Sequence, residues 1–222
     1  MNPAGFARRY AAWSLDAAAI AALATVVAWP LLEPAVAAFP AAAASLVTIT
    51  ADALFGGMMA GHPLPAVAAE LSRDPRLLAS AGALRAALLD MAWPFVAAYA
   101  VLSLAWHAAS VASRWQASPG KRAFGLMVVG PDASRPTGAR AIGRHLAAAL
   151  SWLTLNIGHL MALGPAHAAL HDRVAGTRVC TREETPPRAG AVAAWIALQG
   201  VLAFALAGWL LRAVGGLAAG QP

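Results

Sequence analysis

The chain has 222 residues, of which 60% are hydrophobic and 12% are charged, and its mean hydropathy is +0.62. Soluble globular domains carry about 25% charged residues, so the composition excludes that class and indicates an integral membrane protein. The net charge of +6 does not indicate nucleic-acid binding, because the basic residues lie in short segments beside apolar stretches.

The first apolar segment, residues 10–32, is long enough to cross a hydrocarbon core of about 30 Å. Arg8 and Arg9 precede it, and Asp16 is the only charge inside it. The segment is longer than the apolar region of a cleavable signal peptide and contains an acid, so we expect a retained helix. A carboxylate at that depth is costly, and Asp16 must therefore be paired or protonated.

Two further segments, residues 91–113 and 190–214, are also apolar enough to cross. The loop 114–145 holds six basic residues and one acid, which is typical of a cytoplasmic loop, whereas acids outnumber bases in residues 33–90. We therefore expect a cytoplasmic N-terminus, an external insertion over 33–90 and a cytoplasmic loop over 114–145.

Residues 146–169 are apolar, but basic residues flank both ends, and residues 181–189 form a linker to the last helix. A re-entrant hairpin that turns near Asn156 or Gly164 would keep both flanks on one side, and a plain spanning helix would separate them. Both alternatives stay open. The sequence thus predicts an all-α integral membrane protein with three to four transmembrane segments, for one of which a re-entrant hairpin is the alternative.

Two short stretches have the composition of strands. Residues 124–129 follow the turn Ser118-Pro119-Gly120, and residues 177–180 form a second β-like run. Both lie on the side expected to be cytoplasmic, so we expect them to pair as a short ribbon.

Polar residues in the apolar segments are the candidate functional groups. Counting back from Arg114, His107 lies at nearly the same depth as Asp16, which makes the two candidate partners across antiparallel helices. Such a pair has two interpretations. It could exchange protons or cations, or it could hold the helices together as a structural contact.

His167, His171 and Asp172 have the spacing H-x3-H-D, which on a helix would place two imidazoles on one face beside a carboxylate. We interpret this as an interfacial polar patch and not a metal site, because no further ligand or catalytic partner accompanies it. Gly120-Lys121 lacks the other residues of a phosphate-binding loop, and no nucleophile with a base stands out. We therefore expect neither an enzyme nor a cofactor.

Three motifs occur in order along residues 4–180: AGFARRYAAWSLD at 4–16, SPGKRAFGLMVV at 118–129 and HDRVAGTRV at 171–179. Together they resemble the motifs of the RDD family of bacterial multi-pass membrane proteins, which is named for one arginine and two aspartates. The resemblance implies that Arg9 is this arginine and that Asp16 and Asp172 are the aspartates. Asp172 is then a candidate partner for Arg9, with backbone groups and lipid headgroups as alternatives.

The resemblance implies an inner-membrane protein, and some members of the family are linked to cation/proton exchange. We therefore expect a transporter of small cations or other solutes in which Asp16 changes its occupancy. Too few helices surround one Asp16 to line a path, so a homo-oligomer or a partner membrane protein is expected. The alternative is a non-transporting scaffold or accessory subunit whose basic cytoplasmic face binds a partner protein or anionic lipid.

Overall fold

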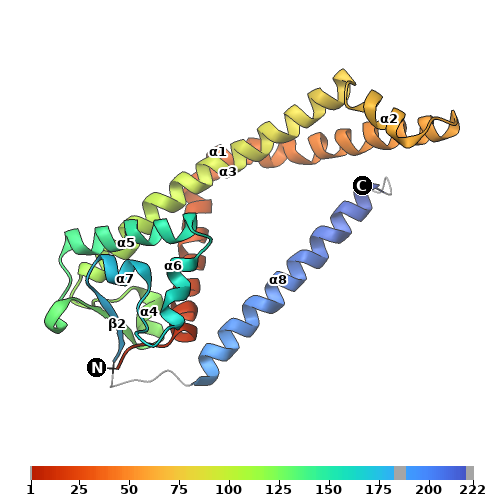
Figure 1. Cartoon of the computed structure of the whole chain (residues 1–222). Coiled ribbons are helices and arrows are strands. Elements are labelled where there is room, and N and C mark those ends of the chain that lie inside the picture. The colour runs from red at the N-terminus through yellow and green to blue at the C-terminus, as the bar shows by residue number, and fades with distance from the viewer. Residues whose placement is uncertain (1, 183–188, 219–222) are drawn as a thin grey trace. The chain divides into compact units, whose positions relative to one another are not determined.

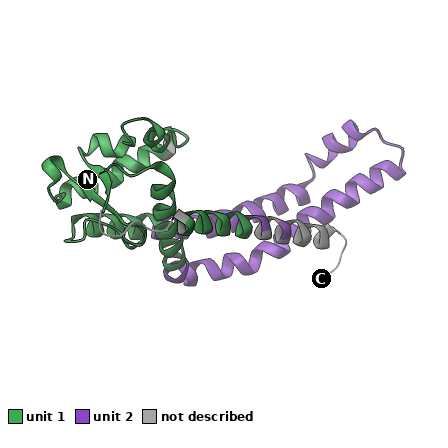
Figure 2. Ribbon diagram, turned by 90° about the horizontal axis from the view of Figure 1, so that it is seen from below, with its two compact units in different colours: residues 1–24, 99–202 green, residues 25–98, 203–222 purple. Residues whose placement is uncertain are grey.

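The structure, a computed structural model, describes residues 2–182 and 189–218 (Figure 1). The chain divides into two compact units, which Figure 2 shows in different colours. Unit 1 comprises residues 1–24 and 99–202, and unit 2 comprises residues 25–98 and 203–222. Each unit is described by itself below.

Unit 2 is built around a helical hairpin. Helix α1 (Phe6–Met59) enters this unit at residue 25, and helix α3 (Pro75–Ala112) leaves it at residue 98. The short helix α2 (Leu64–Leu71) joins them. A hydrogen bond of 2.8 Å between the hydroxyls of Ser45 and Ser80 ties α1 to α3.

The expected helix boundaries at residues 32 and 91 differ from the observed ones. Helix α1 continues through Pro30, Pro34 and Pro40, and α3 begins sixteen residues before the expected start. The alanine-rich sequence favours helix, and an apolar environment tolerates proline in helices because the backbone has no water to bond instead. Most of residues 33–90 therefore extend the two helices. The location of residues 33–90 outside the membrane stays a prediction.

Both long helices expose apolar surface. Within the described residues, α1 and α3 are the two helices long and apolar enough to cross a membrane, and only 28% and 11% of their most apolar windows are buried. Helices in the core of a soluble protein would be covered, so these surfaces require an apolar environment. Helix α8 (Ala189–Ala218) contains a shorter apolar stretch, Val192–Phe204, and a third and a fourth span stay predictions.

Unit 1 surrounds a two-stranded sheet. Strand β1 (Leu126–Val129) pairs antiparallel with β2 (Arg178–Thr181), with Val128 opposite Val179, and this confirms the predicted ribbon. Pro3 forms an isolated bridge to Cys180 beside it. Unit 1 also contains the start of α1, the end of α3 and the start of α8. Its short elements are α4 (Pro119–Ala123), η1 (Pro131–Ala133), α5 (Gly138–Leu153), α6 (Ile157–Leu160), η2 (Met161–Leu163) and α7 (Leu170–Val174).

The core of unit 1 is small and apolar, and it joins the start of α1 to the sheet and to α5. Small side chains dominate it, which lets the backbones of these elements approach closely. Its buried members are Ala4, Ala11, Ala12, Val111, Phe124, Leu126, Val128, Ala141 and Val179.

The plain spanning helix over residues 146–169 is wrong. Helix α5 ends at Leu153, and Leu155 and Asn156 adopt positive φ angles of 51° and 65°. Arg144, before this segment, contacts Asp172, after it, which a crossing of about 30 Å would prevent. The chain therefore returns, as the alternative with a turn near Asn156 requires. Ile142, Leu146 and Leu150 form an exposed apolar stripe on α5, although the depth of this segment in a membrane stays a prediction.

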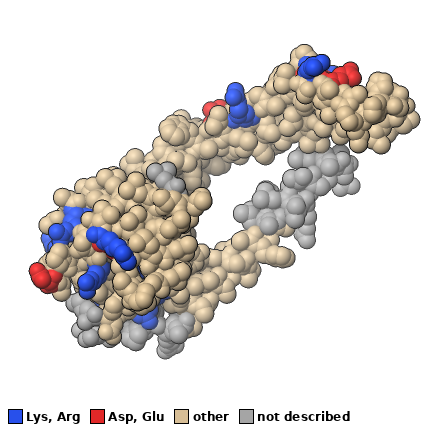
Figure 3. All heavy atoms as spheres, viewed as in Figure 1, with Lys and Arg blue, Asp and Glu red and all other residues tan. Residues whose placement is uncertain are grey.

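Charge is unevenly placed along the chain. Figure 3 shows blue lysine and arginine side chains gathered on unit 1, and a few further blue and red side chains along the long, mostly uncharged helices. The basic loops that the positive-inside rule singled out therefore belong to one folded unit.

Candidate functional site

Asp16 is the centre of a buried cluster that joins α1, α3 and α4. Its side chain is 1% exposed and accepts three hydrogen bonds. The indole Nε1 of Trp106 on α3 donates to Oδ1 at 3.1 Å, the Gly120 amide donates to Oδ1 at 2.8 Å, and the Ser118 hydroxyl donates to Oδ2. The buried carboxylate is thus held by neutral donors, and among the described residues it forms no salt bridge.

The turn Ser118-Pro119-Gly120 is shaped for this contact. Ser118 is extended, and Pro119 begins α4, where a missing amide hydrogen costs nothing because no helical partner exists there. A Cβ on Gly120 would lie 2.8 Å from Asp16 Cγ and would also collide with the carbonyl oxygen of Ala12. Glycine is therefore required at this position by close approach of α4 to α1.

Lys121, the single lysine of the chain, lies beside Asp16. Its Nζ donates to the Ser118 hydroxyl at 3.3 Å, so one serine oxygen lies between the ammonium and the carboxylate. Burial, opposed by the nearby charge of Asp16, lowers the pKa of Lys121 from 10.5 to about 8. The lysine can therefore lose its proton within one or two pH units of neutrality.

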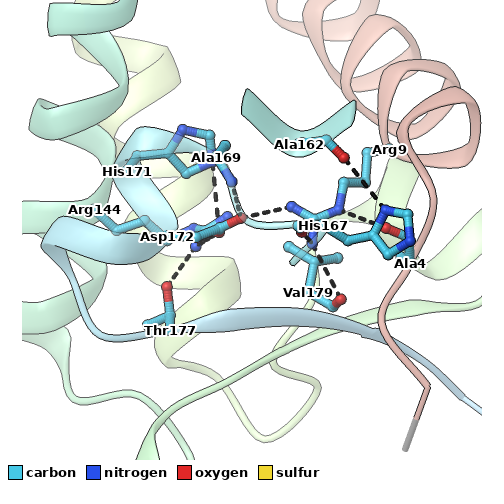
Figure 4. Close-up of polar contacts among 10 residues, drawn as sticks. All are labelled: Ala4, Arg9, Arg144, Ala162, His167, Ala169, His171, Asp172, Thr177 and Val179. Atoms are coloured by element: carbon cyan, nitrogen blue, oxygen red, sulfur yellow. Dashed lines mark hydrogen bonds and ion pairs between the residues drawn. The ribbon is translucent and has the colours of Figure 1, made fainter. Parts of the chain in front are cut away.

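A second buried cluster is built on Asp172, on α7. Arg9 Nη1 donates to Oδ2 at 2.6 Å, and Arg144 Nη1 donates to Oδ1, so Asp172 lies between two guanidinium groups (Figure 4). The Ala169 amide also donates to Oδ2 at 3.0 Å, which caps the start of α7. Arg144 Nη1 makes a further bond to the Thr177 hydroxyl at 2.5 Å. One carboxylate thus holds together α1, α5 and α7.

Arg9 also binds backbone carbonyl groups. Its Nε donates to Ala4 at 3.0 Å, and its Nη2 donates to the carbonyls of His167 at 2.5 Å and Val179 at 3.3 Å. Asp172 and the backbone were both among the partners considered for Arg9, and both are present. The planar guanidinium, with five donors, suits such a junction better than a lysine would.

Electrostatics keep the second cluster charged. Burial would raise the pKa of Asp172, but the charges of Arg144 and Arg9 hold that pKa below its usual value. Burial and the charge of Arg144 lower the pKa of His171 to about 2. His171 is therefore neutral at physiological pH, and its contact of 3.6 Å with Asp172 is not an ion pair.

Two expected arrangements of histidines are absent from the described residues. His107 is not bonded to Asp16, because the neighbouring Trp106 occupies the position facing Asp16. The ring of His107 instead stacks on that of His145, with the two ring centroids 5.3 Å apart. His167 and His171 do not share a helix face, since α7 begins at Leu170 and His167 has a φ of 45°. The ring of His171 instead contacts that of His159.

Four residues of the two clusters were not identified from the sequence as partners: Trp106, Ser118, Lys121 and Arg144. Ser118 and Lys121 stand in a quoted motif, which was a usable signal, whereas Trp106 and Arg144 lie outside the motifs. Among the described residues, no group of three histidine, cysteine or acidic side chains is placed to hold a metal ion.

Comparisons with known proteins identify the family of the chain. The model of the RDD family matches residues 3–176, a range that contains Arg9, Asp16 and Asp172. The uncharacterized protein YxaI of Bacillus subtilis (strain 168) is 34% identical over 79 residues, which are 36% of this chain and 52% of that protein. The chain thus spans about half the length of this relative, and no solved structure matches it. With more than half of its residues matched by the family model, the chain belongs to the RDD family of membrane proteins.

Proposed function

We propose that the protein is a carrier of small monovalent cations that exchanges them for protons at a site formed by Asp16, Ser118 and Lys121. The observation behind this proposal is the arrangement of Asp16, Ser118 and Lys121, in which one hydroxyl lies between a buried carboxylate and a partly buried ammonium group. Ionisable groups buried among apolar helices are costly, so they are candidates for a functional role.

Competition between a proton and a cation follows from the charges. When Lys121 is protonated, its ammonium neutralises Asp16 through Ser118, and a second cation is repelled. When Lys121 loses its proton, the site has one negative charge and oxygen ligands on Asp16 and Ser118, which suit a small hard cation. The site is then neutral with either occupant, and one proton leaves for each cation that binds.

Transport also needs a path, for which two described spans are too few. The exposed apolar faces of α1 and α3 are available for other helices as well as for lipid. We therefore infer a homo-oligomer or a partner membrane protein. The basic residues grouped on unit 1 favour an inner-membrane protein with a cytoplasmic N-terminus.

The test is dye-reported exchange of Na⁺ or K⁺ for protons in inverted membrane vesicles. We expect exchange in the wild type, and its loss in Asp16→Asn and Lys121→Met at matched membrane abundance. Asp132→Asn removes an exposed carboxylate in η1 and is the control, with unchanged exchange expected. Absence of exchange from the wild type, across Na⁺, K⁺ and Li⁺, would contradict the proposal.

A second candidate function is a non-transporting scaffold or accessory subunit. It is favoured by the three neutral donors that already bind Asp16, because a carboxylate so held can act as a fixed structural anchor. On this interpretation, Asp16→Asn keeps most of the helix contacts and the protein remains folded, with no ion flux to lose. The vesicle experiment therefore separates the two functions.

A further inference from the structure

The end of α3 carries an exposed cluster of two arginines on one tryptophan. The guanidinium carbon of Arg122 lies 4.4 Å from the ring centroid of Trp115, and that of Arg114 lies 5.3 Å from it. All three residues are exposed. Stacking of guanidinium groups on an indole fixes their planes and leaves their N–H edges open to a ligand.

The backbone around Trp115 holds the cluster in place. The Ser113 hydroxyl accepts the Trp115 amide at 3.1 Å and donates to the Ser110 carbonyl at 2.7 Å, which turns the chain at the end of α3. The next residue, Gln116, exchanges two hydrogen bonds with Val128 on β1, at 2.7 and 3.2 Å. Trp115 therefore projects from a fixed turn between α3 and the sheet.

The two arginines have no acidic partner within residues 2–182 and 189–218. Two like charges on one ring repel each other, and an anion that bonds to both relieves this repulsion. A phosphate oxygen pair suits the bidentate geometry of each guanidinium. The charge and geometry thus point to a phosphate as the ligand.

The position of the cluster identifies the source of that phosphate. Helix α3 is long and apolar enough to cross a membrane, and it ends at Ala112, three residues before Trp115. Tryptophan is enriched at the level of the headgroups, where its ring is apolar on its face and polar at its N–H. We propose that Arg114, Trp115 and Arg122 form a binding site for the headgroup phosphate of an anionic phospholipid. The site is independent of whether the protein transports ions.

Native mass spectrometry of the purified full chain, titrated with phosphatidylglycerol or phosphatidylcholine, tests this site. We expect the wild type to retain phosphatidylglycerol in preference to phosphatidylcholine. The double variant Arg114→Gln/Arg122→Gln should bind phosphatidylglycerol about tenfold more weakly, since two charge-assisted contacts are lost. The matched control Arg135→Gln/Arg173→Gln removes two other exposed arginines of unit 1. Its affinity for phosphatidylglycerol should stay within about twofold of that of the wild type, because only the general electrostatic attraction of the anionic lipid is reduced.

A further variant guards against loss of folding. Arg114→Lys/Arg122→Lys keeps the charge but not the bidentate edge, so we expect intermediate affinity with the wild-type melting temperature. Equal weakening in the glutamine double variant and the control would overturn the site. So would displacement of the lipid by inorganic phosphate at an equal concentration, because the ligand would then be a free anion.

Discussion

Arg9 and Asp172 lie 163 residues apart in the chain and form a salt bridge of 2.6 Å in the interior of unit 1. The side chain of Asp172 is fully buried and that of Arg9 is 12% exposed, so water screens the pair weakly. The contact joins the first turn of α1 to α7, and so it connects the two ends of the region that the family model matches.

Replacement of Asp172 by asparagine should strongly destabilise the protein. Arg9 and Arg144 would both remain buried without a counter-charge, which costs about 3 to 5 kcal/mol in the free energy of unfolding. Thermal unfolding in detergent would measure the loss. Asp74→Asn, which breaks an ion pair with Arg76 at the surface, is the control and should change the melting temperature little.

Gly120→Ala should lower stability and disturb Asp16. The added methyl would collide with the Ala12 carbonyl and the Asp16 carboxylate, so α4 must move away from α1. Gly143→Ala provides a control on α5, where a Cβ meets no atom within 4 Å and alanine favours helix. Circular dichroism melts of both variants would test this difference, and equal melting temperatures would contradict the close approach.

Lys121 should titrate near pH 8. Because the chain has one lysine, selective ¹³C labelling of lysine side chains gives a single ε-methylene resonance whose shift reports the pKa. Na⁺ should move the midpoint to lower pH if the cation and the proton compete at Asp16. A midpoint near 10.5, as in a solvated lysine, would show that the amine is not buried.

The same shift predicts how stability depends on pH. The folded protein loses the Lys121 proton at a lower pH than the unfolded chain, so between about pH 8 and 10.5 the unfolded state binds more protons. The contribution of Lys121 to the free energy of unfolding therefore rises with pH across this window. Urea unfolding of wild type and Lys121→Met at pH 7.5 and 9.5 would measure it, with a smaller rise expected in the variant.

The return of the chain between α5 and α7 can be checked by cysteine labelling. Cys180 is buried and is the single cysteine, so a Cys180→Ser background is suitable. Arg135→Cys and Arg173→Cys flank the segment 146–169, and a membrane-impermeant maleimide should label both from the same side of a vesicle. Labelling from opposite sides would contradict the return of the chain.

The sequence was sufficient for elements whose signal is local. Hydropathy predicted the apolar helices, and the strand composition of residues 124–129 and 177–180 predicted the ribbon. Helix ends were predicted less well, because the end at residue 32 rested on apolar length and charge, whereas α1 continues past Glu33 and through Pro34. A rule based on amino-acid composition takes no account of whether a helix lies in water or in an apolar environment.

Partners of buried charges were predictable only in part. Counting residues along the helices indicates the depth of Asp16 and of His107 but not the direction in which each side chain points, and it is Trp106 that faces Asp16. Arg144 contacts Asp172 through a chain reversal of 28 residues, and no local pattern encodes that reversal. Such contacts require the tertiary structure.

The separation of Arg9 from Asp172 has a consequence for biosynthesis. At about 5 to 20 residues per second, a ribosome needs roughly 8 to 33 s to synthesise the 163 residues between them. During that time α1 is completed while Arg9 still lacks Asp172, and Asp16 lacks all three of its donors until Trp106 is made. A nascent chain that stops short of residue 172 therefore leaves Arg9 and Arg144 without the acidic side chain that pairs with both in the folded protein.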